Sequence, residues 1–309
     1  MRSLRSWVLV LASLAATAIG APRAAAQTDP IKLLHTPTSH GERIAYGPGP
    51  LNFGELRLPP GRGPFPVAIL VHGGCWSSTL NEEGVPPAMV SYELLEPAAD
   101  ALTRLGIATW NIEYPRVGDV GGGWPGTYRA ISEATDHLRA LAPRRHLDLG
   151  RVIALGHSSG GQLSLWLAVR GRLPKTSAIY SKPAVTLRGV VDVDGMPDLK
   201  SFWPLQQQMC DAPVVTSLLG GSPQEVPDRY REASPGPFLP LRIPQMFLLR
   251  AEPQSTRRIS EQYVATARKA GDPVTSVDQQ GRSHFDGINP ESKDWAPVVQ
   301  SVKAMLGLS

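Results

Sequence analysis

Short apolar runs alternate along the chain with segments in which apolar residues recur every three or four positions. The apolar runs predict β-strands, and the unbroken run at residues 67–71 is typical of a central strand covered on both faces. Further runs predict strands at residues 107–114, 152–155, 187–193, 243–249 and 274–277. Residues 51–58 alternate between apolar and polar side chains, which predicts a half-exposed antiparallel strand.

The periodic segments predict amphipathic helices between these strands. They span residues 97–105, 127–143, 256–270 and 295–306. Strands that alternate with helices predict a mostly parallel sheet with helices on both faces, and so an α/β fold. We expect a single domain over residues 27–309. The proline-rich, poorly periodic segment 196–240 interrupts the alternation, and we expect it to form a lid over the pocket.

A Gly-X-Ser-X-Gly pattern between a strand and a helix is typical of a nucleophile elbow. The sequence Gly-His-Ser-Ser-Gly-Gly at residues 156–161 follows an apolar run and leads into a helical segment. Side chains at positions 156 and 160 would collide with neighbouring chain in so tight a turn, so glycine is required there. Ser158 is therefore the candidate nucleophile. The helix after it directs its N-terminal N–H groups at developing negative charge.

A second glycine-containing loop follows the buried strand at residues 67–71. It reads His-Gly-Gly-Cys-Trp at residues 72–76. Consecutive glycines allow backbone N–H groups to approach a ligand closely, so this loop can donate to an oxyanion together with the N–H of Ser159. We interpret His72 as a residue that braces this loop rather than as a catalytic base.

A serine hydroxyl is a poor nucleophile at neutral pH and needs a base, which in turn needs an acid to orient it. In this architecture the chain order is serine, acid, histidine. His284 is the only histidine after Ser158, and it lies in the segment Gly-Arg-Ser-His-Phe-Asp-Gly directly after the last predicted strand. The acid is expected just beyond the strand at residues 243–249, where Glu252 lies.

The first 26 residues have the pattern of a signal peptide. Arg2 and Arg5 precede an apolar stretch, and residues 24–26 form an Ala-X-Ala cleavage site. The stretch is shorter than the roughly 20 residues that span a bilayer, so we expect export to the periplasm or beyond and no stable membrane anchor. Removal of Arg2, Arg5 and Arg23 leaves 28 basic against 27 acidic residues, a net charge of +1. That balance argues against a nucleic-acid partner.

The two cysteines and three aromatic residues complete the candidate site. Export permits a disulfide between Cys75 and Cys210, and two unpaired thiols are the alternative, because the sequence does not give the distance between their Cα atoms. Trp76, Tyr114 and Trp124 are candidate substrate contacts, since loops at strand ends on this side line the pocket; burial within the fold is the alternative.

The elbow, the His-Gly-Gly-Cys-Trp segment and the Gly-Arg-Ser-His-Phe-Asp segment together resemble the α/β-hydrolase superfamily. The likeness covers residues 51 to 307, in the branch whose His-Gly-Gly-X-Trp motif occurs in esterases and kynurenine-formamidase-like enzymes. The resemblance implies an α/β-hydrolase fold with Ser158 as nucleophile and His284 as base. It implies an oxyanion hole formed by the backbone of Gly74, Cys75 and Ser159.

One segment departs from that family pattern. Relatives generally carry a Gly-X-X-Asp-Pro-like turn after this strand, whereas residues 249–253 read Leu-Arg-Ala-Glu-Pro. Glu252 can hold the imidazole tautomer as an aspartate does, with one more methylene of reach. Some relatives place the acid after the preceding strand, which makes Asp198 the alternative.

These features predict an exported serine hydrolase that cleaves carboxylic esters of small molecules through an acyl-enzyme, with no metal or organic cofactor. An amidase or arylformamidase with the same triad is the close alternative, because the fold does not choose the substrate. Because residues 249–253 depart from the family pattern, a binding protein with the same fold but without catalytic activity is a further alternative. The sequence gives no indication of the oligomeric state.

Overall fold

A computed structural model describes residues 27–79 and 86–309. Its centre is one sheet of eight strands. They are β1 (Glu42–Ala45), β2 (Phe53–Arg57), β3 (Phe65–Val71), β4 (Ala108–Ile112), β5 (Leu147–His157), β6 (Gly189–Val193), β7 (Gln245–Leu249) and β8 (Val274–Asp278). Their order in the sheet is β1-β2-β4-β3-β5-β6-β7-β8. Strand β2 runs antiparallel to β1 and β4, and every other pair is parallel, as in the predicted α/β fold.

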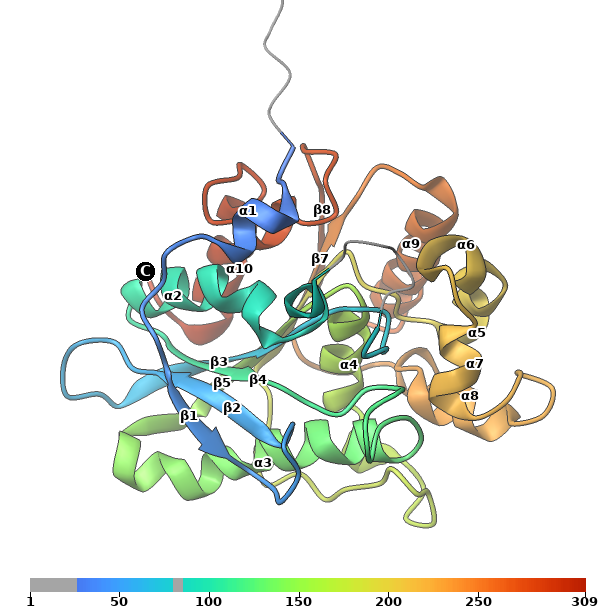
Figure 1. Ribbon diagram of the computed structural model, residues 1–309, viewed down its shortest axis with the longest axis horizontal. Coiled ribbons are helices and arrows are strands. Elements are labelled where there is room, and N and C mark those ends of the chain that lie inside the picture. The colour runs from blue at the N-terminus through green and yellow to red at the C-terminus, as the bar shows by residue number, and fades with distance from the viewer. Residues whose placement is uncertain (1–26, 80–85) are drawn as a thin grey trace, which may run out of the picture.

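Helices cover both faces of this sheet (Figure 1). They are α1 (Pro30–Leu34), α2 (Glu96–Arg104), α3 (Gly126–Arg145), α4 (Ser159–Leu167), α5 (Leu199–Phe202), α6 (Gln206–Cys210), α7 (Val214–Leu219), α8 (Pro227–Ala233), α9 (Gln254–Lys269) and α10 (Trp295–Leu306). Helices α2 and α10 pack into the apolar core on one face, and α3, α4 and α9 pack into the core on the other. The side chains of β3 divide between the two cores, because successive residues of a strand point to opposite faces.

The strand register places the ends of the central strands side by side. Val71 of β3 pairs with Gly156 of β5, and His157 of β5 pairs with Val193 of β6. Because these strands are parallel, the loops that follow them leave the sheet at the same edge. In open α/β sheets this carboxyl-end edge is where ligands bind.

The structure confirms the strands predicted between residues 51 and 277 but corrects one expectation about exposure. All five residues of β2 are buried, including Glu55 and Arg57. Arg57 lies 2.9 Å from Glu55 and 3.2 Å from Glu96 of α2, and its Nε donates to the carbonyl of Ser39. The polar residues of this alternating segment are therefore buried with partners, and alternation alone did not distinguish this from exposure to water.

Strand β1 was missing from the sequence prediction. Its four residues, Glu-Arg-Ile-Ala, are exposed or half-exposed at the edge of the sheet. So short an edge strand buries little apolar surface, and no periodicity marks it in the sequence.

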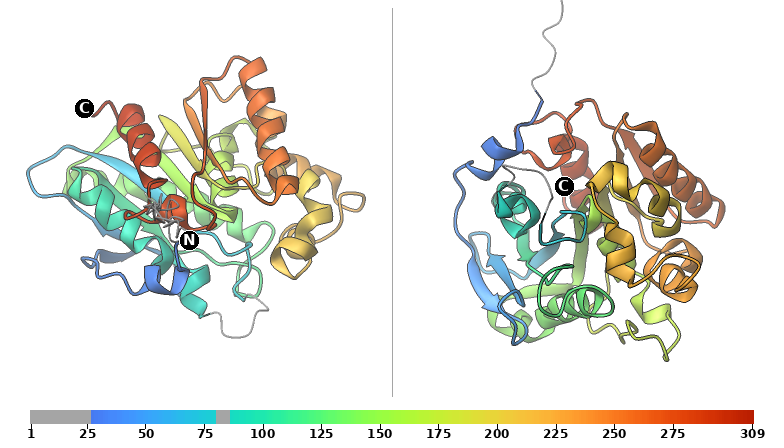
Figure 2. Two further views of the ribbon diagram at one scale, coloured as in Figure 1. Left: turned by 90° about the horizontal axis from the view of Figure 1, so that it is seen from above. Right: turned by 45° about the vertical axis from the view of Figure 1, so that its right-hand side comes forward.

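The segment 196–240 folds into the four short helices α5–α8. The two views of Figure 2 show them beside α9 at one end of the molecule. Phe202 of α5 packs against Trp76, with ring centres 6.0 Å apart, and Cys210 of α6 is disulfide-bonded to Cys75. The segment therefore lies against the loop after β3. Its role as a lid stays a prediction.

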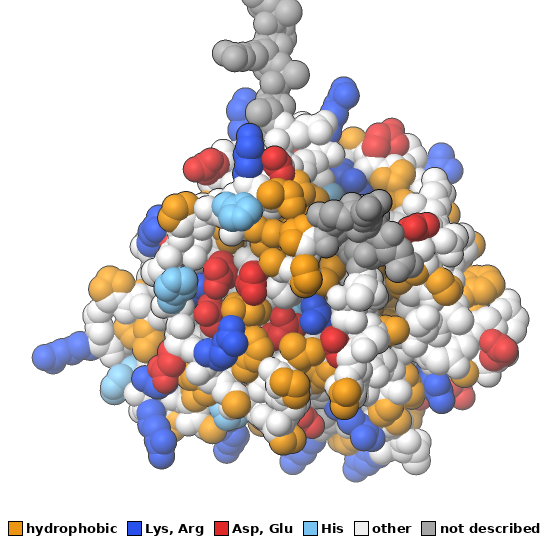
Figure 3. Space-filling view, in the orientation of Figure 1, with side chains coloured by type: hydrophobic (Ala, Val, Ile, Leu, Met, Phe, Trp, Pro, Cys, Tyr) orange, Lys and Arg blue, Asp and Glu red, His pale blue; other side chains and the backbone are white. Residues whose placement is uncertain are grey.

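The expected signal peptide lies outside the described residues. Within the described ranges, no helix is long and apolar enough to cross a membrane. On the face seen in Figure 3, basic and acidic side chains are interspersed over the described surface, in keeping with the near balance of charge after residue 26.

We expect Leu70→Ala to lower the free energy of unfolding by about 2–5 kcal/mol, because it leaves a cavity in a close-packed core. Leu70 lies on β3 and is fully buried, whereas Leu105, which directly follows α2, is 44% exposed. Leu105→Ala is the matched control, with an expected loss of about 0.5 kcal/mol or less. Urea unfolding measures both, and equal losses would contradict the described core.

Candidate active site

Ser158 lies in the turn between β5 and α4, in a conformation that few residues other than glycine adopt. Its φ and ψ are 55° and −125°, and the residue is half-exposed. Its N–H donates to the carbonyl of Val193 over 2.9 Å, which ties the turn to β6. Backbone strain of this kind costs about 1–3 kcal/mol and is found mainly at functional sites. The predicted strand–turn–helix geometry around Ser158 is confirmed.

The glycines of the elbow are required by neighbouring backbone. A Cβ at Gly156 would lie 2.0 Å from the carbonyl oxygen of Gly160, and one at Gly160 would lie 2.0 Å from that of Val71. A Cβ at Gly73 would lie 2.9 Å from the Cβ of Ser158. The loop after β3 thus packs directly against the elbow, as the collision argument predicted.

Both loops contain backbone N–H groups that have no hydrogen-bond partner among the described residues. Gly74 has a φ of 109° and Cys75 a φ of 53°. The N–H groups of Gly74, Cys75 and Ser159 make no hydrogen bond to any other described residue, whereas the Trp76 N–H donates to Ser159 Oγ over 3.4 Å. This is the free-donor pattern that an oxyanion hole needs.

His72 braces this loop, as predicted. The ring is fully buried, with Nδ1 2.7 Å from the Gly73 carbonyl and Nε2 3.0 Å from the Glu113 carboxylate. Tyr114 stacks on the ring and donates its hydroxyl to the His72 carbonyl over 2.8 Å. Burial raises the pKa of Glu113, but the charge and hydrogen bond of His72, with Arg116, outweigh burial and leave that pKa below its usual value.

The acid that contacts His284 is Asp194. Its Oδ2 accepts a hydrogen bond from Nδ1 of His284 over 2.5 Å. Asp194 directly follows β6 in a left-handed turn with a φ of 51°, and its carboxylate is 8% exposed. Because β6 is the neighbour of β5, its end lies beside the elbow. An aspartate directly after β6 is therefore long enough to contact His284.

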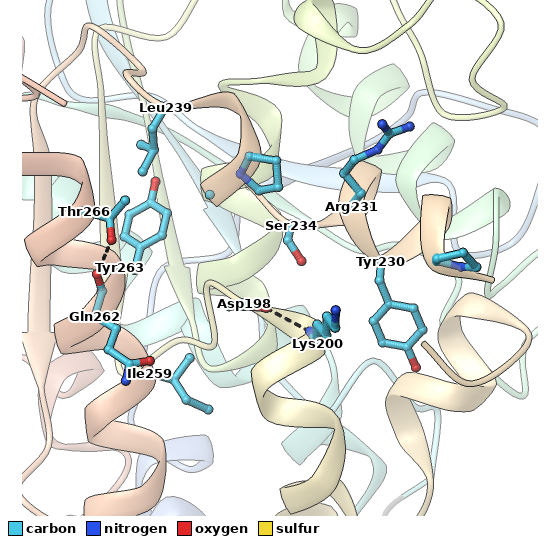
Figure 4. A pocket seen from close by; sticks show the side chains of 13 residues that line it. Asp198, Lys200, Tyr230, Arg231, Ser234, Leu239, Ile259, Gln262, Tyr263 and Thr266 are labelled. Carbon is cyan, nitrogen blue, oxygen red and sulfur yellow. Dashed lines mark hydrogen bonds between the residues drawn. The ribbon is translucent and has the colours of Figure 1, made fainter. Parts of the chain in front are cut away.

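Glu252 does not contact His284, which corrects the expectation from the sequence. It is exposed, and its Oε2 accepts from the N–H of Gln254 at the start of α9. The alternative, Asp198, caps α5 by accepting from the N–H groups of Lys200 and Ser201. It lines a cavity of about 420 Å³ between α5, α8 and α9 (Figure 4). The sequence signal for Asp194 is an aspartate-glycine pair directly after an apolar strand.

A second aspartate, Asp192, holds the turn that carries Asp194. Its Oδ1 accepts from the N–H of Gly195 over 2.6 Å, and its Oδ2 is buried without a hydrogen-bond partner among the described residues. Burial raises the pKa of Asp192 to about 8, as does the charge of Asp194, while the Gly195 hydrogen bond opposes the rise. The carboxyl is therefore neutral at pH 7.

His284 is held beside the elbow by His157, the residue before Ser158. Nε2 of His157 donates to the carbonyl of His284 over 2.9 Å, and the two ring centres are 4.5 Å apart. Burial lowers the pKa of His157 well below its usual value, and the charge of His284 lowers it further. His157 is therefore a neutral donor that fixes the backbone of the His284 loop.

Two of the three predicted substrate contacts are buried in the fold. Trp76 is 1% exposed and its Nε1 donates to the side chain of Gln162, and Tyr114 is fully buried against His72. The expectation for these two residues is therefore wrong, because neither offers surface to a ligand. Trp124 is partly buried against Tyr128, and its contact with substrate stays a prediction.

Cys75 and Cys210 form a disulfide, with their Cα atoms 6.1 Å apart. This settles the alternative that the sequence left open. The bond joins the candidate oxyanion loop to α6, across 135 residues of sequence.

Reduction of this disulfide is expected to lower the free energy of unfolding by about 2–4 kcal/mol, because the bond restricts the unfolded chain. Thermal or urea unfolding of the unmutated protein with and without dithiothreitol measures the effect. The Cys75→Ser/Cys210→Ser double variant is the control: it should match the reduced protein and be insensitive to dithiothreitol. A midpoint that dithiothreitol leaves unchanged in the unmutated protein would contradict the expectation.

Comparison with solved structures finds the same architecture in esterases. Esterase B from Lactobacillus rhamnosis, inhibited by a tributyrin phosphonate, matches with a TM-score of 0.70 and 18% identity, over 89% of this chain and 90% of that one. A truncated carbohydrate esterase from gut microbiota matches with a TM-score of 0.69 and 17% identity, over 87% and 97%. A bacterial heroin esterase matches with a TM-score of 0.67 and 18% identity, over 90% and 87%. No curated protein matches the sequence significantly.

The sheet order, the elbow and these matches define an α/β-hydrolase fold. A family model described as BD-FAE matches residues 55–260, which is more than half of the chain. The protein therefore belongs to the BD-FAE family.

Proposed function

We propose that the protein is an exported serine esterase in which Ser158 is the nucleophile, His284 the general base and Asp194 the acid. The observation that carries this proposal is the 2.5 Å contact between His284 and Asp194, on a loop that His157 fastens to the elbow. That contact fixes the tautomer in which Nδ1 carries the proton, so Nε2 of His284 is free to accept one.

In the first half-reaction, Oγ of Ser158 attacks the ester carbonyl carbon while its proton passes to Nε2 of His284. The imidazolium then gives that proton to the alcohol oxygen as the carbon–oxygen bond breaks. In the second half-reaction a water loses a proton to Nε2, attacks the acyl-enzyme carbonyl and releases the acid, and the proton returns to Ser158. Asp194 stabilises the imidazolium of each half-reaction without accepting its proton.

The negative oxygen of each tetrahedral intermediate would accept hydrogen bonds from the N–H groups of Gly74, Cys75 and Ser159. Those groups have no other hydrogen-bond partner among the described residues, so they need not break a bond to donate. The positive end of α4 adds to the stabilisation, because Ser159 is the first residue of that helix. Loss of one such donor typically costs about 100- to 1,000-fold in rate.

The proposed substrates are carboxylic esters of small molecules. The structural neighbours include a carbohydrate esterase, a heroin esterase and an esterase inhibited by a tributyrin phosphonate, which support ester hydrolysis as the reaction class. Export is supported by the signal-peptide pattern of residues 1–26 and by the disulfide, since disulfides persist mainly in oxidising compartments.

Asp194→Asn is expected to lower kcat for a p-nitrophenyl acetate substrate by about 1,000- to 10,000-fold, because the amide no longer holds the required tautomer or balances the imidazolium. Glu252→Gln is the matched control, with the same loss of one carboxylate charge at an exposed position. It should retain activity within about threefold of the unmutated protein. A large loss in Glu252→Gln with activity kept in Asp194→Asn would reverse the assignment.

Ser158 is expected to react covalently with a fluorophosphonate, adding one phosphonyl group per chain, because the reagent imitates the tetrahedral intermediate. Mass spectrometry of the intact protein and its peptides measures the addition. Ser158→Ala should neither label nor hydrolyse p-nitrophenyl acetate, whereas Ser159→Ala, which keeps its backbone N–H, should still label. Labelling of Ser158→Ala to the same extent would refute the nucleophile.

A further inference from the structure

Arg250 occupies the turn after β7, where the sequence pattern led us to expect the acid. Its Nε lies 2.6 Å from Oδ2 of Asp194, the same oxygen that accepts from Nδ1 of His284. The Arg250 side chain is 16% exposed and the Asp194 side chain 8%. A carboxylate oxygen that faces two nitrogens from two different loops is thus held in a largely water-free position, where charges act strongly.

The contact between Arg250 and Asp194 is an ion pair without an aligned hydrogen bond. Nε of Arg250 is buried and has no hydrogen-bond partner among the described residues, although it lies within ion-pair distance of the carboxylate. The hydrogen bond to Oδ2 comes from His284. Arg250 therefore acts on this carboxylate through its charge, and its side chain does not take the place of the histidine.

Three further titratable groups lie around His284, and each has its own hydrogen-bond partners among the described residues. His157 is buried and neutral, since burial, followed by the charges of His284 and Arg250, lowers its pKa well below the usual value. Asp192 holds the Asp194 turn, and burial raises its pKa to about 8, so this carboxyl is mostly protonated at pH 7. On the histidine's own loop, Asp286 accepts from the Ser283 N–H and the Thr28 N–H and hydroxyl.

We propose that Arg250 is a positioning residue whose cation offsets part of the charge of Asp194, so that the His284 ring stays neutral to lower pH than it would beside Asp194 alone. Neutral His284 is the form that can accept the Ser158 proton. A carboxylate favours the protonated ring and a nearby guanidinium disfavours it, so the two charges oppose each other at this site. The proposal rests on the proposed function, because it concerns the base of that reaction.

The sign of the effect follows from these charges. Removal of the Arg250 cation leaves Asp194 uncompensated and makes protonation of His284 easier. In a plot of kcat/KM against pH, the fall on the acidic side (the acidic limb) reports the ionisation of the free enzyme's base. We therefore expect Arg250→Gln to move the acidic limb upward by about half to one pH unit, a size typical of one partly exposed charge at this range. A merely structural role would lower stability or rate without moving the limb.

The first experiment measures kcat/KM for p-nitrophenyl acetate from pH 4.5 to 7.5 at constant ionic strength, a range that lies below the Asp192 pKa of about 8. Arg250→Gln and Arg250→Met, which keeps the aliphatic bulk, should both show the upward shift, and Arg250→Lys should keep the limb near that of the unmutated protein. Arg258→Gln is the matched control: Arg258 is an exposed residue of α9, and its loss should leave the limb in place.

A second measurement needs no turnover. The imidazole Cε1–H signal of His284, assigned by its absence in His284→Asn, is followed by NMR over the same pH range in the unmutated protein and in the Arg250 variants. An upward shift of its midpoint in Arg250→Gln and Arg250→Met supports the proposal. A midpoint that stays within 0.2 pH units, or moves downward, overturns it.

These outcomes separate the inference from the proposed function. An unmutated protein that neither hydrolyses esters nor labels at Ser158 refutes the esterase assignment, and the NMR titration still decides the role of Arg250. If the limb and the midpoint stay in place while KM rises only for an anionic ester such as p-nitrophenyl hemisuccinate, Arg250 binds substrate and the proposal is wrong.

Discussion

The site depends on the close approach of two backbone segments at the carboxyl ends of β3 and β5. At Gly160 a single added carbon would meet the carbonyl of Val71 at 2.0 Å, and at Gly73 it would meet Ser158 at 2.9 Å. Only hydrogen fits at these positions. The N–H groups of Gly74, Cys75 and Ser159, which have no hydrogen-bond partner among the described residues, belong to these two contacting loops.

Buried polar side chains next to the two loops hold them in place through hydrogen bonds. His72 joins Gly73 to Glu113, and Asp192 holds the turn of Asp194 through Gly195. His157 fastens the His284 loop to the strand that ends in the elbow. Buried polar groups are costly unless they are paired, so each of these pairs restricts its loop to one arrangement. The disulfide adds a covalent restraint from the side of α6.

The titratable side chains at the site lie in the loops that follow three neighbouring strands. The acid follows β6, the arginine beside it follows β7, and the histidine follows β8. In the family pattern the turn after β7 is an expected place for the acid, and here that turn supplies a cation instead. The aspartate that contacts His284 follows β6, one strand closer to the elbow, so charged groups from the loops after β6 and β7 both lie at the His284 contact.

The sequence by itself determined the central strands and the long helices between them, the elbow at Ser158, the bracing role of His72 and the choice of His284 as the base candidate. These features depend on local rules: apolar periodicity, the steric need for glycine in a tight turn, and chain order. The tertiary structure decided that Asp194 rather than Glu252 or Asp198 faces His284, that Trp76 and Tyr114 are buried, and that Cys75 pairs with Cys210. Such pairings depend on which strands are neighbours and on where side chains meet across loops far apart in sequence, and no local pattern encodes those distances.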